Sequence, residues 1–354
     1  GKNAQVDVGS LVATTLAPKN ADYINGFVSN ITGANPALSI ANEKDDPILA
    51  GSAGSAYTGS LVRVDTGAQI TTAEGGRIQL YAKRVENAGT LTAPGGQVVL
   101  GGGAEVFYKL PTAEALYASE ANPNVPALRG LLVEVGRADL ASGDGKVENT
   151  GSISVPRGNA TLVGLAVNQA GRISATTSVS QNGSILLLAQ GDAGTNDLRN
   201  PATILTTSSP DYKRAVRSGT LTLAAGSSTE ITPDANGADG KPLTNDDNAT
   251  FTRSRLALTG SQIYIQGRIT APGAIAEVRA LDRPSYDDLL NKQGFTPNGG
   301  SLTLGPQASI DLSGTTDTTV SVARNFVTTE LLGSNDLKDA PLQKDGLLYR
   351  NKVT

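Results

Sequence analysis

A short motif repeats along the chain at a spacing of 20 residues, and this spacing constrains the fold more than any other feature. Residues 75–80, Gly-Gly-Arg-Ile-Gln-Leu, recur at 95–100 as Gly-Gly-Gln-Val-Val-Leu. A second motif at 85–94 recurs at 147–156, and a weaker copy begins 20 residues later at Val167. Self-similarity at a fixed short period is typical of repeat proteins, in which each unit packs on its neighbours.

Each copy of the motif predicts two short strands joined by a turn that contains Gly, Asn or Pro. Apolar residues alternate with Thr, Gln and Tyr, as in Leu221 and Leu223 or Ile263 and Ile265. Alternate residues of a strand share one face, so each strand has an apolar and a polar face. Short strands at about ten-residue spacing also suit a sandwich, but the constant 20-residue offset favours a β-solenoid with stacked parallel ladders. The predicted core includes Ile78, Leu80, Leu91, Val98 and Leu100.

The composition suits a narrow core shared between stacked turns. The 354 residues include 41 Gly, 9 Tyr and 5 Phe, with no Trp, Cys, His or Met. Without Cys or His the chain has no disulfide, no thiolate or imidazole zinc site, and no Ser-His-Asp or Cys-His catalysis. A net charge of -4 argues against nucleic-acid binding. No apolar run approaches the roughly 18 residues of a transmembrane helix, so we expect no transmembrane segment.

Insertions interrupt the repeat, and we expect them to leave the solenoid wall as loops. They span 104–140, 192–217, 233–250 and 281–298. Short helical segments are expected in the first and last of these, at 112–120 and 285–291. From 315 to 354 the pattern is lost, which predicts an irregular tail or the lead into further repeats.

Two stretches near the N-terminus carry a family resemblance. Residues 3–16 are Asn-Ala-Gln-Val-Asp-Val-Gly-Ser-Leu-Val-Ala-Thr-Thr-Leu, and Asn-Ala-Asp-Tyr follows at 20–23. Residues 85–100 follow the pattern V-x-N-x-G-x-[IL]-x-A-P-G-G-x-[VI]-x-L. Both stretches resemble the secretion domain of filamentous-haemagglutinin-type exoproteins, over about residues 1–103. From 147 onward the resemblance lies in the repeats.

That family consists of two-partner-secretion proteins of Gram-negative bacteria, which cross the outer membrane through a dedicated β-barrel transporter. The resemblance implies an all-β, right-handed parallel β-helix with loop and short-helix insertions. Residues 1–103 would form the C-terminal part of a secretion-type domain, and 141–314 would continue the repeats. It also implies secretion to the outer cell surface. The first residues show neither an initiator Met nor a signal pattern, so we expect an internal or processed segment of a longer protein.

Most members of the family act as adhesins or biofilm components. The resemblance therefore implies a structural segment of a secreted adhesin that acts in adhesion, aggregation or biofilm formation. Its expected partners are the transporter during secretion, and glycans or proteins on host or bacterial surfaces. Two alternatives stay open, because some members carry a distant C-terminal toxin and solenoids also host pectin-cleaving enzymes. These are the delivery stalk of a contact-dependent toxin and a polysaccharide-active β-helix enzyme.

We expect no catalytic residue, cofactor or resident metal, and no enzymatic activity. Acid pairs at 45–46, 246–247 and 287–288 would need a fixed separation across a sugar cleft to act as a glycosidase, and solvated loop acids are the simpler interpretation. The run at 234–240 resembles part of a calcium loop, but an ordinary turn is favoured. Short basic groups such as Lys83-Arg84 are interpreted as solvated charges rather than glycan contacts.

Aromatic side chains in the insertions are the expected interaction surface. They are Phe107, Tyr108, Tyr117, Tyr286 and Phe295. Rings on loops can stack on sugars or on another protein, or they can pin the loop onto the solenoid wall. We favour pinning for these rings. A binding surface would still be expected here, because the repeat faces consist mostly of Ser, Thr, Gly and Val.

Overall fold

The residues that the structure describes are built from β-strands, most of which lie in three parallel sheets. A computed structural model of the chain describes residues 1–18, 38–39, 60–109, 131–136, 144–177, 182–191, 217–234, 254–281, 299–314, 329–330 and 349–353. No helix occurs among them. For these residues the prediction of an all-β fold with parallel sheets is confirmed. The helical segments expected at 112–120 and 285–291 lie outside the described residues, as do most of the later insertions.

The three sheets are numbered here in the order in which the chain passes through them from Leu61 onward. Sheet 1 contains β5 (Leu61–Val64), β8 (Arg84–Asn87), β13 (Lys146–Asn149), β16 (Ala166–Gln169), β20 (Thr220–Leu223), β23 (Gln262–Ile265) and β26 (Ser301–Leu304). Sheet 2 contains β1 (Gln5–Val8), β6 (Gln69–Thr72), β9 (Thr90–Thr92), β14 (Ser152–Pro156), β17 (Arg172–Thr177), β21 (Ser228–Pro233), β24 (Arg268–Thr270) and β27 (Ser309–Asp311). Sheet 3 contains β2 (Leu11–Thr14), β7 (Arg77–Ala82), β10 (Gln97–Gly102), β15 (Asn159–Gly164), β18 (Ser184–Gly191), β22 (Arg255–Gly260) and β25 (Ile275–Ala280), and β19 (Arg217–Ser218) pairs antiparallel with β18.

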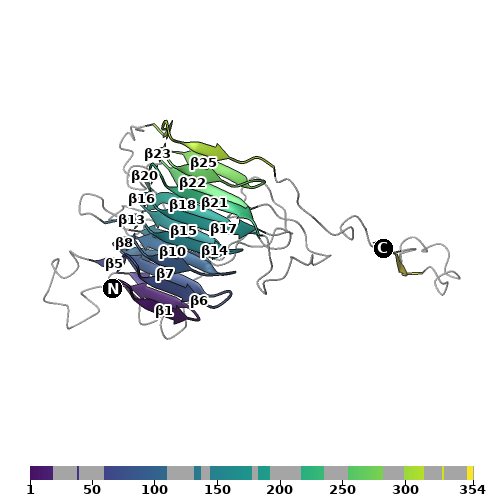
Figure 1. The fold of residues 1–354 in the computed structure, drawn as a ribbon, viewed down its shortest axis with the longest axis horizontal. Helices are drawn as coiled ribbons and strands as arrows, with labels where there is room; N and C mark the ends of the chain where they lie inside the picture. Colours follow the sequence, from purple (N-terminus) through teal and green to yellow (C-terminus); the bar gives the residue numbers. More distant parts are fainter. Residues whose placement is uncertain are drawn as a thin grey trace, which may run out of the picture.

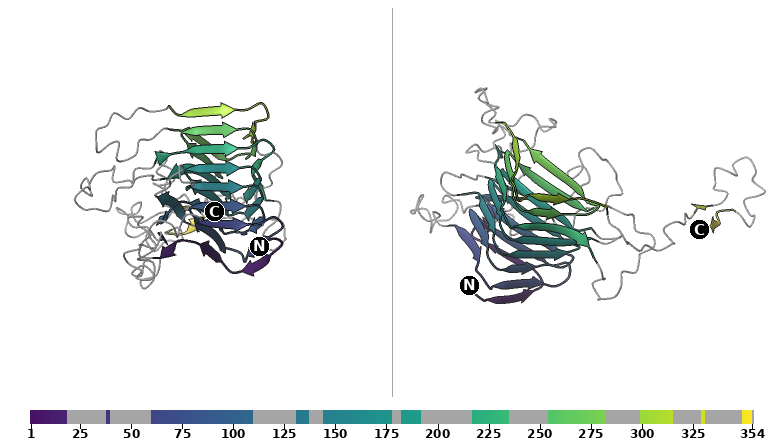
Figure 2. Two further views of the ribbon diagram at one scale, coloured as in Figure 1. Left: turned by 90° about the vertical axis from the view of Figure 1, so that its left-hand side faces the viewer. Right: turned by 45° about the horizontal axis from the view of Figure 1, so that its top comes forward.

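The chain visits the three sheets in rotation, and each passage adds one strand to each sheet. The strands β8, β9 and β10 form one such circuit, and β13, β14 and β15 form the next. Figure 1 shows the strands stacked from the N-terminal end, in purple, to the C-terminal end, in green. The left view of Figure 2 shows successive circuits as parallel rungs.

The pairing register matches the sequence repeat. Ser152 on β14 pairs with Arg172 on β17, and Arg77 on β7 pairs with Gln97 on β10, both at the 20-residue offset. Val85 pairs with Val147, although 62 residues separate them, because these residues begin equivalent copies of the longer motif. Copies of the repeat are therefore neighbours in the sheets, and the insertions leave the register unchanged.

The main core lies between the three sheets. The side chains of Ile78, Leu80, Leu91, Val98 and Leu100 are all buried in it, as predicted. Equivalent positions of successive circuits stack on one another because the strands pair in register. At the C-terminal end the same positions open to solvent: Leu302 is 47% exposed, whereas its register partner Ile263 is 0% exposed.

The Asn and Gly of the repeat have structural roles at the corner between sheets 1 and 2. Asn87 donates a side-chain hydrogen bond to Asn149 over 2.8 Å, and Asn149 donates to Gln169 over 2.7 Å. All three amides are buried, so this ladder satisfies polar groups that would otherwise be costly to bury. A Cβ added at Gly151 would lie 2.1 Å from the carbonyl oxygen of Gly89, so successive corners approach too closely for a side chain.

The described part of segment 104–140 contradicts the expectation that it leaves the wall as a loop. β11 (Glu105–Lys109) and β12 (Leu132–Gly136) form an antiparallel pair, and β11 also pairs with β4 (Leu38–Ser39), which pairs with β3 (Ala17–Pro18). This four-stranded sheet packs on the outer face of sheet 3. A second apolar cluster lies between the two sheets and contains Leu16, Leu38, Tyr81, Val99, Val106, Tyr108, Val133, Val135 and Val163.

Within 315–354 the structure describes one pair of short strands. β28 (Thr329–Glu330) and β29 (Lys352–Val353) pair antiparallel and join none of the three parallel sheets.

Replacement of Leu100 by Asp tests the main core. Leu100 is fully buried between its register partners Leu80 and Leu162, so the variant buries an unpaired charge. We expect the free energy of unfolding to fall by roughly 4 kcal/mol or more. Thr90→Asp is the control, because Thr90 is exposed. Denaturant unfolding followed by circular dichroism measures both, and equal stabilities of the two variants would contradict the assignment of the core.

Candidate binding groove on sheet 2

Of the five aromatic residues expected to form an interaction surface, two are described and both are buried. Phe107 is 3% exposed and Tyr108 is 6% exposed. The expectation that they face a partner is therefore wrong for these two residues. Tyr108 is buried because its face of β11 packs against sheet 3, whereas Phe107 lies on the opposite face of the same strand. Tyr117, Tyr286 and Phe295 lie outside the described residues.

Tyr108 instead pins its strand to the wall, which is the interpretation favoured from the sequence. Its ring centroid lies 6.0 Å from that of Tyr81 on β7, with the rings tilted by 60°. Burial, together with the interaction with the neighbouring Tyr108, raises the pKa of Tyr81 well above its usual value. Burial also raises the pKa of Tyr108. Both phenols thus stay neutral inside the second apolar cluster.

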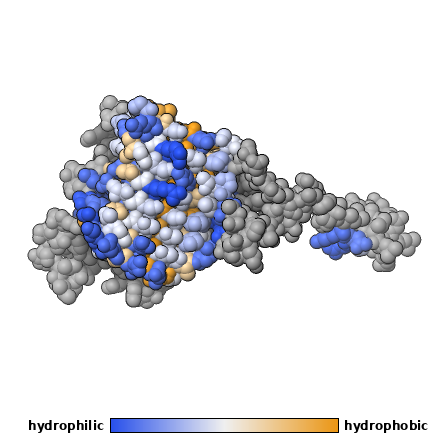
Figure 3. Space-filling view, viewed as in Figure 1, coloured by the Kyte–Doolittle hydropathy of each residue, from blue (hydrophilic) through white to orange (hydrophobic). Residues whose placement is uncertain are grey.

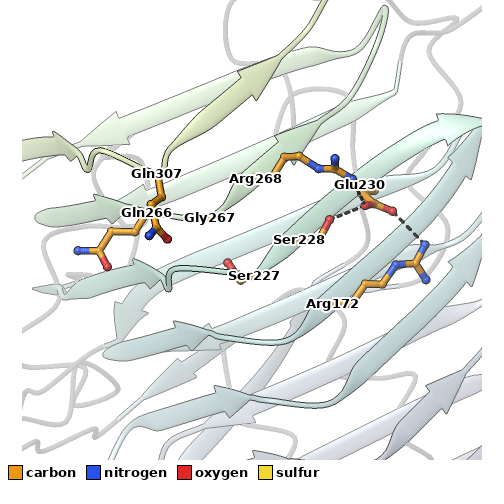
Figure 4. Close-up of a pocket in the computed structure, with 9 residues that line it drawn as sticks. Arg172, Ser227, Ser228, Glu230, Gln266, Gly267, Arg268 and Gln307 are labelled. Atoms are coloured by element: carbon orange, nitrogen blue, oxygen red, sulfur yellow. Dashed lines mark hydrogen bonds and ion pairs between the residues drawn. The ribbon is translucent and has the colours of Figure 1, made fainter.

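A groove of about 360 Å³ lies on the outer side of sheet 2, where β21 and β24 leave the corner from sheet 1. Figure 4 shows two arginines and a glutamate on neighbouring strands, with two glutamines nearer the corner. The groove is lined by Arg172, Gly226, Ser227, Ser228, Glu230, Gln266, Gly267, Arg268 and Gln307. None of these lining residues is aliphatic or aromatic.

Glu230 lies between the two arginines and binds both. Its carboxylate accepts a hydrogen bond from Arg172 Nη2 over 2.9 Å and one from Arg268 Nη2 over 3.2 Å. The hydroxyl of Ser228 also donates to Glu230. The register places Arg172, Ser228 and Arg268 side by side on β17, β21 and β24. The in-register sheet therefore gathers two cations from strands that are 96 residues apart in the sequence.

The hydrogen bonds at Glu230 determine its ionisation. Partial burial opposes ionisation, but hydrogen bonds from Ser228, Arg172 and Arg268 outweigh it and lower the pKa of Glu230 from its usual value. The carboxylate is therefore charged at neutral pH. One glutamate and two arginines leave a net charge of one positive unit in this cluster, which we call the Arg–Glu–Arg cluster.

Ser227 and Gly267 shape the floor of the groove. Ser227 is buried, and a Cβ added at Gly267 would lie 2.1 Å from its hydroxyl oxygen. Any side chain at 267 would therefore displace Ser227. Gln266 and Gln307 are exposed beside this floor.

Sequence reasoning missed this groove, although a signal was present. The apolar and turn positions of the copies define the repeat, and the polar position that begins each strand was not compared between copies. Arg172, Ser228 and Arg268 occupy the same position of three copies, each followed by a β-branched residue at a buried position. An alignment of the copies in columns would have placed the two arginines together.

The other sequence candidates are only partly described. Lys83 pairs with Asp144 over 3.0 Å, and Arg84 with Glu86 over 2.9 Å, so both basic residues are in ion pairs. Asp234, the first residue of the suggested calcium run, pairs with Arg157 over 3.2 Å. The acid pairs at 45–46, 246–247 and 287–288 lie outside the described residues.

No family model matches the chain, and the search of curated proteins gives no match. Within the described part of the chain, no helix is long and apolar enough to cross a membrane.

Replacement of Glu230 by Gln should make stability less sensitive to acid. A carboxylate with a lowered pKa stabilises the folded chain above its unfolded pKa, about 4.3, and this stabilisation is lost as pH falls through the folded pKa. We therefore expect the wild type to exceed Glu230→Gln in free energy of unfolding at pH 7, and the difference to shrink below about pH 4.5. Urea unfolding from pH 7 to pH 3 measures it. A difference that stays constant over this range would contradict the ion-pair assignment.

Proposed function

We propose that the three parallel sheets form a right-handed parallel β-helix. The rotation of the chain through the sheets supports this fold, since each circuit adds one in-register strand to every sheet. Right-handedness is the usual sense for a connection between parallel strands of one sheet. It is also the sense implied by the family resemblance of residues 3–16 and 85–100.

We propose further that the chain is a structural segment of a large secreted bacterial adhesin exported by two-partner secretion. The observation that carries this proposal is the match between the family-like repeat and the circuits: residues 85–100 cover most of β8, β9 and β10, which make one complete circuit. On this proposal the chain passes through an outer-membrane β-barrel transporter, lies at the outer surface of a Gram-negative cell, and acts in adhesion, aggregation or biofilm formation through surface glycans or proteins.

A stack of circuits suits a stalk because each added circuit makes the protein longer. Each circuit contacts only its neighbours, so the protein extends along one axis without needing a wider core. Polar residues such as Thr90 and Arg172 face outward from sheet 2, which keeps the outer face wetted. On the face seen in Figure 3 the described surface is mostly white to blue.

The enzyme alternative finds little support in the groove. A glycosidase needs a second carboxyl group and a general acid with a raised pKa. Glu230 is the one carboxylate among the lining residues, and its pKa is lowered. The groove is therefore better suited to binding than to hydrolysis. A toxin-delivery stalk would share the same fold, so the fold does not distinguish an adhesin stalk from a toxin-delivery stalk.

Deletion of the coding sequence in the producing bacterium tests the proposed function. Protease treatment of intact wild-type cells should cleave the protein, because it lies outside the outer membrane. The deletion should reduce cell aggregation and surface attachment, and complementation should restore both. Deletion of the transporter gene should leave the protein inside the cell. Protection from protease in intact cells, or unchanged aggregation and attachment, would contradict the proposal.

A further inference from the structure

We propose that the groove on sheet 2 binds an acidic saccharide, and specifically a chain of uronic acid units whose carboxylates pair with Arg172 and Arg268. This ligand class deepens the proposed adhesive function and rests on it for its biological meaning. The binding itself follows from the residues of the groove, and purified protein can test it.

The two arginines have donors left for a ligand. Each guanidinium carries five N–H donors, and the hydrogen bonds to Glu230 come from Nη2 of each. The side chains remain 53% exposed at Arg172 and 63% exposed at Arg268. The planar guanidinium matches a carboxylate in a two-point hydrogen bond, so an exposed and oriented arginine is a specific site for that group.

Glu230 orients the arginines without cancelling their charge. A free arginine side chain loses considerable rotamer entropy when it binds a ligand. The hydrogen bonds from Arg172 and Arg268 to Glu230 restrict both side chains before a ligand arrives. The cluster keeps a net positive charge, so it still attracts an anion.

The spacing of the arginines favours a repeating ligand over a single anion. Their strands are two steps apart in the sheet, with β21 between them, which is about 9.6 Å at the usual strand spacing. The carboxylate of Glu230 already bridges the two guanidinium groups, so a ligand carboxylate has to use the remaining donors of one arginine or the other. A chain with carboxylates on successive units can place one group at each arginine.

The rest of the groove suits sugar hydroxyls. Gln266 and Gln307 offer amide donors and acceptors, and the lining residues include no apolar side chain that would anchor a peptide. The absence of side chains at Gly226 and Gly267 keeps this part of the groove open. An acidic polypeptide could pair its carboxylates with the two arginines, but the groove offers no pocket for apolar side chains.

Isothermal titration calorimetry on the purified 354-residue chain tests the proposal. The probes are a short galacturonate oligosaccharide, a neutral galactose oligosaccharide of the same length, and a glutamate oligopeptide of similar charge. We expect saturable binding of the galacturonate probe at 0.15 M salt, a concentration that screens long-range attraction, and at least tenfold weaker binding of the other two.

Variants distinguish binding at the groove from nonspecific attraction of the ligand to positive charge. Arg172→Gln with Arg268→Gln should weaken galacturonate binding by roughly tenfold or more. The matched control is Arg63→Gln with Arg84→Gln, which removes the same charge from a second cluster, where both arginines contact Glu86 on sheet 1. This control should change binding less than twofold. Arg172→Lys with Arg268→Lys keeps the charge but loses the planar fork, and should show an intermediate loss.

Several outcomes would overturn the proposal. These are no galacturonate binding, equal losses in the two glutamine double variants, and equal binding of the neutral sugar or the peptide. A melting curve for each variant checks that it is folded, and Gln266→Ala with Gln307→Ala keeps the test valid if the arginine variants unfold. That pair should weaken binding at least threefold, and unchanged binding would count against the site. Failure of binding would leave the protease and aggregation results of the proposed function unaffected.

Discussion

The in-register hydrogen bonding of one circuit to the next is the interaction on which the rest of the structure depends. It places each residue directly against its equivalent in the neighbouring copy, as Val85 lies against Val147 and Ser152 against Arg172. The same side-chain type is therefore selected along each buried column. Aliphatic residues fill the columns between the sheets, and the buried amides form a ladder at one corner. Glycine occupies the neighbouring turn, where the carbonyl oxygen of Gly89 leaves no room for a Cβ on Gly151.

This constraint explains which features could be predicted from the sequence. The strands, the parallel pairing and the five core residues follow from a 20-residue offset and an alternation of period two, which are local patterns. The packing of Phe107 and Tyr108 could not be predicted in the same way. Their strand pairs with β4, so that Val106 lies against Leu38, and no repeated motif links these distant segments. The Arg–Glu–Arg cluster is an intermediate case. Its two arginines occupy one position of the repeat, so the sequence contains the signal, but that position was not compared between copies.

The same register also connects the fold to the proposed function. The backbone hydrogen bonds between circuits and the narrow apolar core hold the stack together without the outward side chains. Residues at the outward positions are therefore free to vary. Most outward positions on sheet 2 carry hydroxyl groups, while Arg172 and Arg268 add charge at two places beside a groove. On the proposals above, the regular scaffold serves as a stalk. A few outward positions that differ between circuits add a binding site for acidic sugars.

Disulfide formation between engineered cysteines tests the in-register stacking most directly, because the native chain has no cysteine. Thr92 and Ser154 are register partners on β9 and β14, so their Cα atoms should lie about 4.8 Å apart, within the range of a disulfide. Thr90 and Ser154 are two residues out of register, about 8 Å apart. We expect the Thr92→Cys/Ser154→Cys variant to form an intramolecular disulfide on mild oxidation, detected by mass spectrometry of proteolytic peptides, and the Thr90→Cys/Ser154→Cys variant to stay reduced. Equal cross-linking of both pairs, or cross-linking of the second pair alone, would contradict the stacked parallel register.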